Sequence, residues 1–201
     1  MNQPSPLSPV TLEGHFVRLE PMSLQHLDDL STFGLDPELW KLSMPMIRTR
    51  EDLRQYIETA LDEWKAGKSL PFVTIEKTSG KAVGSSRYGN IAMEHRRLEI
   101  GWTWIAPQWQ QTFVNTEAKL LMLAHAFEKL HCVRVEFKTD SLNEHSQKAL
   151  KRIGARQEGI FRNHMITPSG RIRHSVYFSI TDAEWPDVKR NLEAKLAEPR
   201  H

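Results

Sequence analysis

The sequence predicts an α+β domain built on a mixed β-sheet of about seven strands, with helices on its faces and a final helix at the C-terminus. Segments with strand-like alternation recur along the chain and are separated by segments with helical spacing of apolar residues. One strongly apolar helical segment, residues 116–130, lies between two strand-like segments, as in a β-α-β crossover, so those strands are expected to be parallel neighbours. A hairpin pattern later in the chain makes the predicted sheet mixed.

Length and composition narrow the class of protein. The chain has 201 residues, 27 Lys and Arg against 25 Asp and Glu, and one Cys. This length suits one domain, which we place at residues 12–201, after a Pro- and Ser-rich N-terminus at residues 1–11 that we expect to be flexible. A single Cys excludes a disulfide framework and a Cys-rich zinc module.

Partners and location are also constrained. The N-terminus has no basic start and no apolar core, and no apolar run is long enough to cross a membrane, so we expect a soluble, cytoplasmic protein without a membrane partner. A formal net charge of +2 argues against general nucleic-acid binding.

The N-terminal part begins with a strand and two helices. Residues 15–20 alternate as a short strand does. Ser23 is a suitable cap for a helix that follows it. A second helix, with apolar residues at helical spacing over 53–64, is expected to end at Gly67.

The middle and the end of the chain supply the remaining strands. Four strand-like stretches cover residues 70–76, 83–91, 98–105 and 133–139, and the buried helix 116–130 lies between the last two. A short helix over residues 144–153 stops at Gly154. Two late strands flank a Pro-Ser-Gly turn and form the hairpin, and apolar residues at spacings of three and four predict the final helix. The late strands cover residues 156–165 and 171–180, and the final helix carries Trp185, Val188, Leu192 and Leu196.

The loop between Pro107 and Thr116 meets the start of the buried helix. A helix N-terminus presents free backbone N–H groups and a positive dipole end, which suit a phosphate, and Asn115 or Thr116 is the expected cap. The alternative is an ordinary polar loop, because no glycine is present.

Several phrases of the sequence resemble one known superfamily. The order and spacing of EIGWTWIAP, NTEAKLLML, RVEFKTD, NEHSQKALKRIGA and RHSVYFSI are similar to those of GNAT N-acetyltransferases, in the branch similar to ribosomal-protein N-terminal amino-acid acetyltransferases. The resemblance covers roughly residues 12–195. It implies a sheet splayed open between the EIGWTWI and RVEFKTD strands, with acetyl-CoA in that cleft.

The resemblance assigns the cofactor pyrophosphate to the loop. The family pattern Gln/Arg-x-x-Gly-x-Gly/Ala falls on residues 108–113, where Gln111 and Phe113 replace both small residues. We expect the Phe113 ring to point away from the cofactor, and Gln111 to offer its N–H if its φ is negative. The assigned cradle is the backbone of Gln111, Thr112, Phe113, Val114 and Asn115.

The resemblance also assigns the pantetheine arm and the thiol. The segment Trp104-Ile105-Ala106 corresponds to the strand whose backbone pairs with pantetheine, with an N–H near Trp104 polarising the thioester carbonyl. Asn143-x-x-Ser146 matches a family motif in which Asn143 bonds pantetheine and Ser146 lies near the thiol. The alternative, compatible with this one, makes Asn143 a helix cap.

Proton transfer has several candidate residues. Many relatives carry a Tyr acid where this chain has Leu150, so Ser146 is the expected donor. Glu99 is the expected base, and the alternatives are an ordinary surface carboxylate or one of three histidines, whose pKa values lie near neutrality. These are His145, His164 and His174, of which the last two are placed to face each other across the hairpin. No metal-ligand spacing occurs, so we expect no metal.

These observations predict acetyl-CoA-dependent N-acetylation of a primary amine by direct attack, the amine belonging to a small molecule or to a protein N-terminus. The alternative is a non-catalytic GNAT-fold module that binds acyl-CoA or a partner, and a third option changes the acyl group, for example to succinyl. The resemblance allows a homodimer, on which composition is silent. Residues 40–47, which include Trp40, are rich in apolar residues without clear periodicity. They are expected to line the substrate pocket or to contact a second subunit, the alternative being that they cover their own core.

Overall fold

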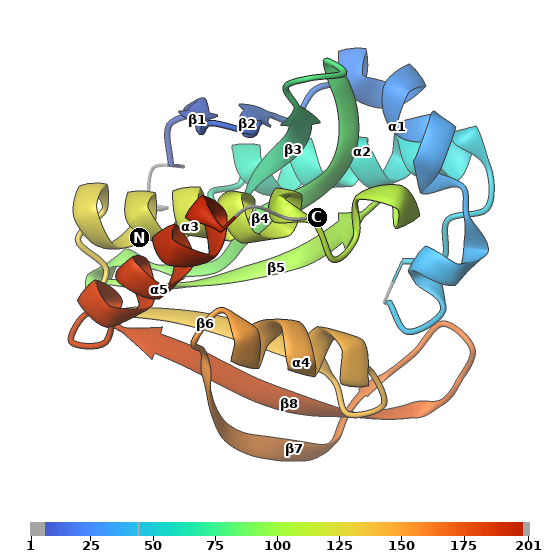
Figure 1. The fold of residues 1–201 in the computed structure, drawn as a ribbon. Coiled ribbons are helices and arrows are strands. Elements are labelled where there is room, and N and C mark those ends of the chain that lie inside the picture. The colour runs from blue at the N-terminus through green and yellow to red at the C-terminus, as the bar shows by residue number, and fades with distance from the viewer. Residues whose placement is uncertain (1–6, 44, 199–201) are drawn as a thin grey trace.

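The computed structural model describes residues 7–43 and 45–198, and its single sheet has eight strands (Figure 1). The strand order is β1-β2-β3-β4-β5-β6-β8-β7, with β5 and β6 parallel and every other neighbouring pair antiparallel. The predicted mixed α+β fold is therefore confirmed, and the strand beyond the predicted seven is the two-residue β1. The bounds are β1 Leu12–Glu13, β2 Val17–Pro21, β3 Leu70–Glu76, β4 Lys81–Ala92, β5 Arg97–Ile105, β6 Arg134–Asp140, β7 Arg156–Ile166 and β8 Ile172–Thr181.

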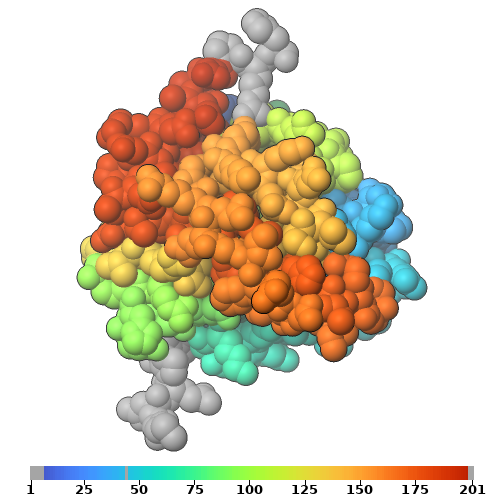
Figure 2. Space-filling view, turned by 90° about the horizontal axis from the view of Figure 1, so that it is seen from below, coloured from blue at the N-terminus to red at the C-terminus, as the bar shows by residue number. Residues whose placement is uncertain are grey.

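The helices divide between the two faces of the sheet (Figure 1). One apolar cluster joins the sheet to α3, α4 and α5, and a second joins the other face to α1 and α2. The bounds are α1 Leu27–Gly34, α2 Arg50–Lys65, α3 Phe113–Ala124, α4 Glu144–Arg152 and α5 Trp185–Ala197, with short helices η1 Leu24–His26, η2 Pro37–Trp40, η3 Met93–His95, η4 Pro107–Trp109 and η5 His125–Lys129. Seen from below, the surface over α4 and the β7–β8 hairpin fills the centre of the molecule (Figure 2). Within the described ranges, no helix has both the length and the apolar character that crossing a bilayer requires.

The helix predicted at residues 116–130 begins three residues earlier, at Phe113. The expected caps, Asn115 and Thr116, are wrong. Thr112 is the N-cap, and its hydroxyl accepts the Val114 N–H at 3.2 Å. The reason is local: Thr112 keeps an extended backbone (φ −99°, ψ −170°), and its short β-hydroxyl reaches the first turn. The helix continues into a single π-turn, η5.

The parallel pairing of β5 with β6 is short. It joins Arg97 to Arg134, Leu98 to Val135 and Glu99 to Glu136. β5 continues to Ile105 and β6 to Asp140, so the two strands run on without further pairing between them in the described chain. The sheet is therefore splayed at this point, as the resemblance implied.

A β-bulge lies in the splayed part of β5. The β4–β5 register changes between Ser85 opposite Trp104 and Arg87 opposite Gly101, so β5 carries one residue more than β4 there. Trp102 in this bulge has φ +51°, a left-handed conformation that is uncommon for a bulky residue. The bulge turns the strand just where its partner β6 has left it.

A buried carboxylate fastens the start of the domain to α3. Glu117 is 5% exposed and accepts the backbone N–H groups of His15, Phe16 and Val17 at 2.8, 2.7 and 2.6 Å. These three donors lie at the entry to β2, just after the turn from β1, and the Glu117 carboxylate accepts all three. Of the predicted flexible segment 1–11, residues 1–6 lie outside the described residues; the Leu7 carbonyl accepts the indole N–H of Trp64 at 2.9 Å.

Replacing Glu117 by Gln is expected to lower the free energy of unfolding by about 2–4 kcal/mol, measured by urea denaturation. The amide retains a single acceptor oxygen and turns its own N–H group toward backbone donors, leaving buried N–H groups unsatisfied. Glu193→Gln, on the exposed face of α5, is the matched control and is expected to stay within about 0.5 kcal/mol. Equal stability of the two variants would contradict the anchoring role of Glu117.

Candidate active site

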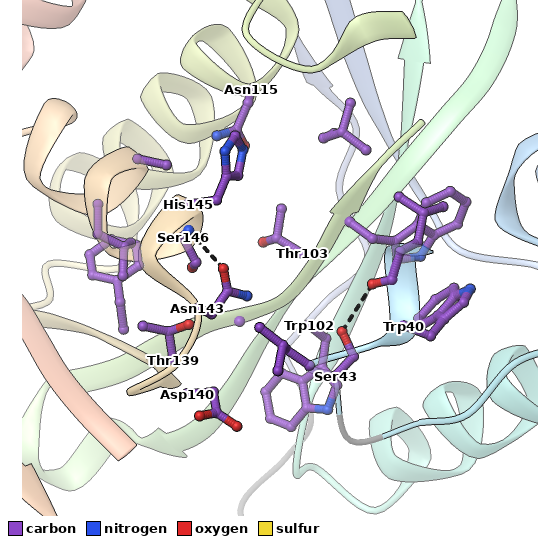
Figure 3. Close-up of a pocket in the computed structure, with 18 of the residues that line it drawn as sticks. Trp40, Ser43, Trp102, Thr103, Asn115, Thr139, Asp140, Asn143, His145 and Ser146 are labelled. Carbon is purple, nitrogen blue, oxygen red and sulfur yellow. Dashed lines mark hydrogen bonds between the residues drawn. The ribbon is translucent and has the colours of Figure 1, made fainter. Parts of the chain in front are cut away.

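The splay between β5 and β6 opens into a cavity of about 710 Å³ (Figure 3). Four parts of the chain line it: the unpaired half of β5, the end of β6, the starts of α3 and α4, and the segment around η2. This volume is in the range of small-ligand pockets. Of the predicted site residues, those in the lining are Glu99, Trp104, Ile105, Gln111, Asn115, Asn143 and Ser146.

The start of α3 forms one end of the cavity. Gln111 has φ +60°, so the condition of a negative φ is not met. The chain must reverse between η4 and α3, and Gln111 takes the left-handed conformation that glycine adopts without steric cost. The Phe113 ring packs on Phe16 with 4.3 Å between centroids, outside the cavity lining. The two bulky replacements of the family pattern are thus accommodated by backbone strain and by turning a ring away.

Two further groups at this end bear on ligand binding: a guanidinium that suits an anion and an amide oxygen that suits a hydrogen-bond donor. The Arg152 guanidinium of α4 donates to Thr116 Oγ1 at 2.7 Å, which brings a positive charge to the first turn of α3. The Asn115 side-chain oxygen is buried and has no hydrogen-bond partner within residues 7–43 and 45–198. A buried acceptor without a partner is energetically costly. Because Asn115 lines the cavity, a ligand bound there can donate a hydrogen bond to this oxygen.

The edge of β5 forms the wall of the cavity. The hydrogen bonds between β4 and β5 show which backbone groups of β5 point to β4 and which point toward the cavity. The Ala106 N–H donates to the Val83 carbonyl at 2.8 Å. Alternate residues of an antiparallel strand direct their backbone groups to the same side, so those of Trp104 also point to β4 and those of Ile105 point toward the cleft. The N–H of Trp104 itself is therefore not the outward donor that the sequence suggested.

The two tryptophans of β5 have different surroundings. Trp104 is 5% exposed and packs on Trp40, with 5.6 Å between ring centroids. Trp102, in the bulge, is 37% exposed, and its ring lies 5.8 Å from the guanidinium of Arg87. Burial accounts for Trp104, whereas Trp102 presents an aromatic surface at the rim of the cavity (Figure 3).

The start of α4 faces the unpaired half of β5 across the cavity (Figure 3). Asn143 is the N-cap of α4, and its Oδ1 accepts the Ser146 N–H at 2.9 Å. Capping uses the oxygen of this amide, and the other end of the amide carries two N–H donors. Leu150, in the position of the family's Tyr, is buried and lines the cavity with an aliphatic surface.

Glu99 is a buried carboxylate at the point where β5 and β6 part. It is 2% exposed, accepts from Asn90 Nδ2 at 2.6 Å and lies 3.4 Å from Lys138 Nζ. The alternative of an ordinary surface carboxylate is therefore wrong, because both neighbouring strands cover this position. Its side chain reaches the cavity lining.

The three candidate histidines lie in different places and have different surroundings. His145 lies at the exposed start of α4 and lines the cavity. A register shift in the hairpin places His164 Nδ1 3.0 Å from Ser175 Oγ and lets His174 Nδ1 accept the Asn163 N–H at 2.8 Å. His164 and His174 therefore bond other partners. Burial, helped by the charges of Lys138 and Arg173, lowers the pKa of His164, which favours its neutral form.

The segment around η2 closes the side of the cavity opposite α3. Trp40 is 2% exposed and donates its indole N–H to the Gly34 carbonyl at 2.7 Å, so it belongs to the second core cluster. Its neighbours Lys41, Leu42, Ser43 and Pro45 line the cavity. Trp40 itself also lines the cavity, so this segment combines core packing with cavity lining; Met44 lies outside the described residues.

One buried residue was missed from the sequence. Lys119 of α3 is 4% exposed, lines the cavity, and donates from Nζ to Thr103 Oγ1 at 2.6 Å and to Ser86 Oγ at 3.0 Å. Burial alone lowers the pKa of this ammonium to about 7. The signal was available: a lysine inside a helix so apolar that most of its faces are buried must itself be buried.

A family model described as an acetyltransferase (GNAT) domain matches residues 17–156, more than half of the chain. The chain belongs to the GNAT acetyltransferase family. The predicted superfamily is confirmed, and the chain is an N-acetyltransferase of a family that uses acetyl-CoA.

Individual relatives agree with this assignment. YdaF of Bacillus subtilis, provisionally named a ribosomal N-acetyltransferase, is 31% identical over 137 residues, 67% of this chain and 73% of YdaF, and supports the predicted branch. A GCN5-related N-acetyltransferase from Brucella melitensis has 33% identity and a TM-score of 0.88 over 96% of this chain and 88% of its own. RimJ of Mycobacterium smegmatis, solved with CoA-disulfide, shares the fold at 24% identity and a TM-score of 0.76, over 94% of this chain and 93% of RimJ.

The residues of the cleft fit a CoA thioester. The positive end of α3 with Arg152 suits phosphates, the unpaired edge of β5 suits the amides of pantetheine, and the unsatisfied Asn115 oxygen awaits a donor.

Lys119→Met is expected to change the pH dependence of stability. Below pH 7 the folded wild type holds a buried ammonium, and between about pH 7 and 10.5 the unfolded chain binds more protons at this residue than the folded one, so wild-type stability rises with pH. The free energy of unfolding of the variant minus that of the wild type should fall by about 2–3 kcal/mol from pH 6 to pH 9, measured by urea titration. A pH-independent difference would contradict the neutralisation of Lys119.

Gln111→Gly tests the strain in the loop. Removing Cβ relieves a left-handed conformation worth about 1–2 kcal/mol, while the more flexible unfolded chain offsets about 0.4–1 kcal/mol. The melting temperature is therefore expected to stay level or to rise by a few degrees. Gln110→Gly is the contrasting variant, since Gln110 has φ −68° and its side chain donates to the Ile105 carbonyl at 2.9 Å; it should lose stability. Loss of stability in Gln111→Gly as well would contradict the strain.

Proposed function

We propose that this enzyme transfers the acetyl group of acetyl-CoA to a primary amine by direct attack, without an acyl-enzyme. The observation that carries the proposal is the cavity at the splay, which brings a helix N-terminus, an unpaired strand edge and the Asn143–Ser146 motif to one space. Bound acetyl-CoA supplies an activated acetyl group. The buried Cys132 supports direct attack, since burial raises the pKa of its thiol to about 11 and leaves little thiolate.

The chain's own residues divide the binding work. Of the predicted cradle, residues 111–115, the backbone of Thr112, Phe113, Val114 and Asn115 is the proposed pyrophosphate cradle, with Arg152 adding positive charge; Gln111, whose φ is positive, forms the turn before it. Ile105, with its neighbours Trp104 and Ala106 holding the strand to β4, offers backbone groups to pantetheine. Asn143 contributes the N–H groups of its amide, and Ser146, which lines the same cavity, is the proposed hydrogen-bond donor to the sulfur.

The amine must arrive neutral or lose a proton at the site. Glu99 is the proposed base, because it lines the cavity while Asn90 and Lys138 hold its carboxylate in place. Asp36 and Glu38 line the entry beside η2 and favour a cationic amine there. The name of YdaF supports a protein N-terminus as acceptor, with small-molecule amines as the competing class.

The test combines binding with an acceptor panel. Isothermal titration measures CoA affinity, and release of free thiol follows turnover with acetyl-CoA and peptides beginning with Ser, Ala or Met, with spermidine, with an aminoglycoside and with free amino acids. We expect CoA binding at micromolar strength and turnover with an N-terminal peptide. Binding without turnover of any amine would favour a non-catalytic module, and absence of binding would contradict the assignment of the cleft.

Two variants separate binding from chemistry. Asn143→Ala should weaken CoA binding about 3–10-fold, the value of one hydrogen bond. Ser146→Ala should lower kcat about 3–10-fold while leaving the Kd of CoA within about 3-fold. Glu193→Gln is the control and should match the wild type in both measurements. Unchanged turnover in Ser146→Ala would remove the role assigned to that hydroxyl.

A further inference from the structure

Lys119 places a cation where proteins avoid one. Its ammonium is buried on the cavity side of α3, and within the described parts of the chain no carboxylate forms an ion pair with it. Burying an unpaired charge costs several kcal/mol, and the apolar core around α3 would accept an aliphatic side chain instead. A function for this amine in the cavity accounts for its position.

One hydroxyl group, that of Thr103, connects the Lys119 amine to the cleft by a hydrogen bond. Lys119 Nζ lies 2.6 Å from Thr103 Oγ1 and 3.0 Å from Ser86 Oγ, and the two hydroxyls are 2.7 Å apart. Ser86 can donate to Thr103 or to the Gly101 carbonyl at 3.4 Å. When Ser86 donates to Thr103, Thr103 accepts hydrogen bonds from both Lys119 and Ser86, and its own O–H hydrogen remains for a partner in the cleft.

Thr103 is placed to meet that partner. It follows the bulged residue Trp102, is itself exposed, and lines the cavity with Ser146 (Figure 3). Lys119 behind it is covered. Thr103 therefore connects the buried Lys119 ammonium, a candidate proton donor, to the part of the cavity that Ser146 also lines.

Acetyl transfer requires a proton donor for the leaving group. When the carbon–sulfur bond breaks, the departing thiolate requires a proton, and Leu150 cannot give one. The Ser146 hydroxyl alone would be left as an alkoxide unless a more acidic group replaced its proton.

We propose that Thr103 is a catalytic residue and that Lys119 acts through it as the proton source for the leaving thiolate. This inference rests on the proposed function. The amine nitrogen bonds to the acetyl carbon, the carbon–sulfur pair leaves with sulfur, and sulfur takes the Thr103 hydroxyl proton as Thr103 takes one from Lys119. The nitrogen's surplus proton goes to Glu99 or water, and water reprotonates Lys119 after product release.

The acidity of Lys119 suits this role. The groups that face its ammonium are hydroxyls, Ser86 from β4 and Thr103 from β5, and burial is the sole cause that lowers its pKa to about 7. An ordinary thiol has a pKa of about 8.5, so transfer from Lys119 to the thiolate is downhill. Above pH 7 the Lys119 ammonium loses its proton, so kcat is expected to decrease as the pH rises further.

The test compares Thr103→Val and Thr103→Ser with Lys119→Met and the double variant Thr103→Val/Lys119→Met. With the best amine of the panel, Thr103→Val and Lys119→Met should each lower kcat about 10–100-fold, Thr103→Ser should stay within about 3-fold, and the double variant should lose no more than either single one. The Kd of CoA should stay within about 3-fold in all. The decrease of kcat above pH 7 should be absent in Lys119→Met. Thr32→Val, exposed on α1, is the control.

A second measurement needs no acceptor. The thiolate absorbance of bound CoA gives the pKa of its thiol, which a hydrogen bond from Thr103 should hold about one unit lower in the wild type than in Thr103→Val. Equal thiol pKa values, or a Thr103→Val enzyme with at least half the wild-type kcat, would overturn the inference. If the wild type lowers the pKa of the bound CoA thiol relative to Thr103→Val but acetylates no amine, the proposed function is contradicted. The contact between Thr103 and the thiol would still be supported.

Discussion

Three residue pairs join β5 to β6, and the site depends on this pairing going no further. Each strand of a sheet normally uses both edges for hydrogen bonds, so a strand that loses its partner halfway presents unsatisfied backbone groups. Here the loss begins after Glu99 and Glu136, and the bulge at Trp102 bends β5 away at the same place. The cavity and the exposed Thr103 are consequences of that divergence, and Glu99, in the last residue pair before it, is still covered by both neighbouring strands.

Helix α3 supports this opening with two buried charges that the fold treats differently. Glu117 accepts hydrogen bonds from three backbone N–H groups at the start of the domain, so its role is structural. Lys119, two residues on, meets only hydroxyl groups and lies against the cavity. Successive odd positions of a helix point about 200° apart, so one carboxylate secures the N-terminal strands while the amine faces the sheet and the site.

The sequence was informative wherever periodicity reports burial. Alternation and helical spacing predicted the helices and strands, and the apolar segment between two strands predicted the parallel pair. The bulge at Trp102, the left-handed Gln111 and the cap at Thr112 were not predicted, because each depends on how the chain must turn to meet another element. The motif residues Asn143 and Ser146 came from resemblance, whereas Lys119 departs from the apolar pattern of its helix and could have been selected on that ground alone. Side-chain geometry, such as the separation of His164 from His174, follows from a register shift that alternation does not reveal.

The anchoring of the β2 entry by Glu117 has a consequence for how the protein is made. The three N–H groups at residues 15–17 leave the ribosome about one hundred residues before the carboxylate that they require. The first strands therefore cannot complete their bonding until α3 has been synthesised, whatever their local preferences. Vectorial synthesis delivers α3 first and the opposite wall of the cleft, β6 and α4, immediately afterwards. The N-terminal edge of the sheet therefore completes these hydrogen bonds only once α3, which also lines the cleft, has been made.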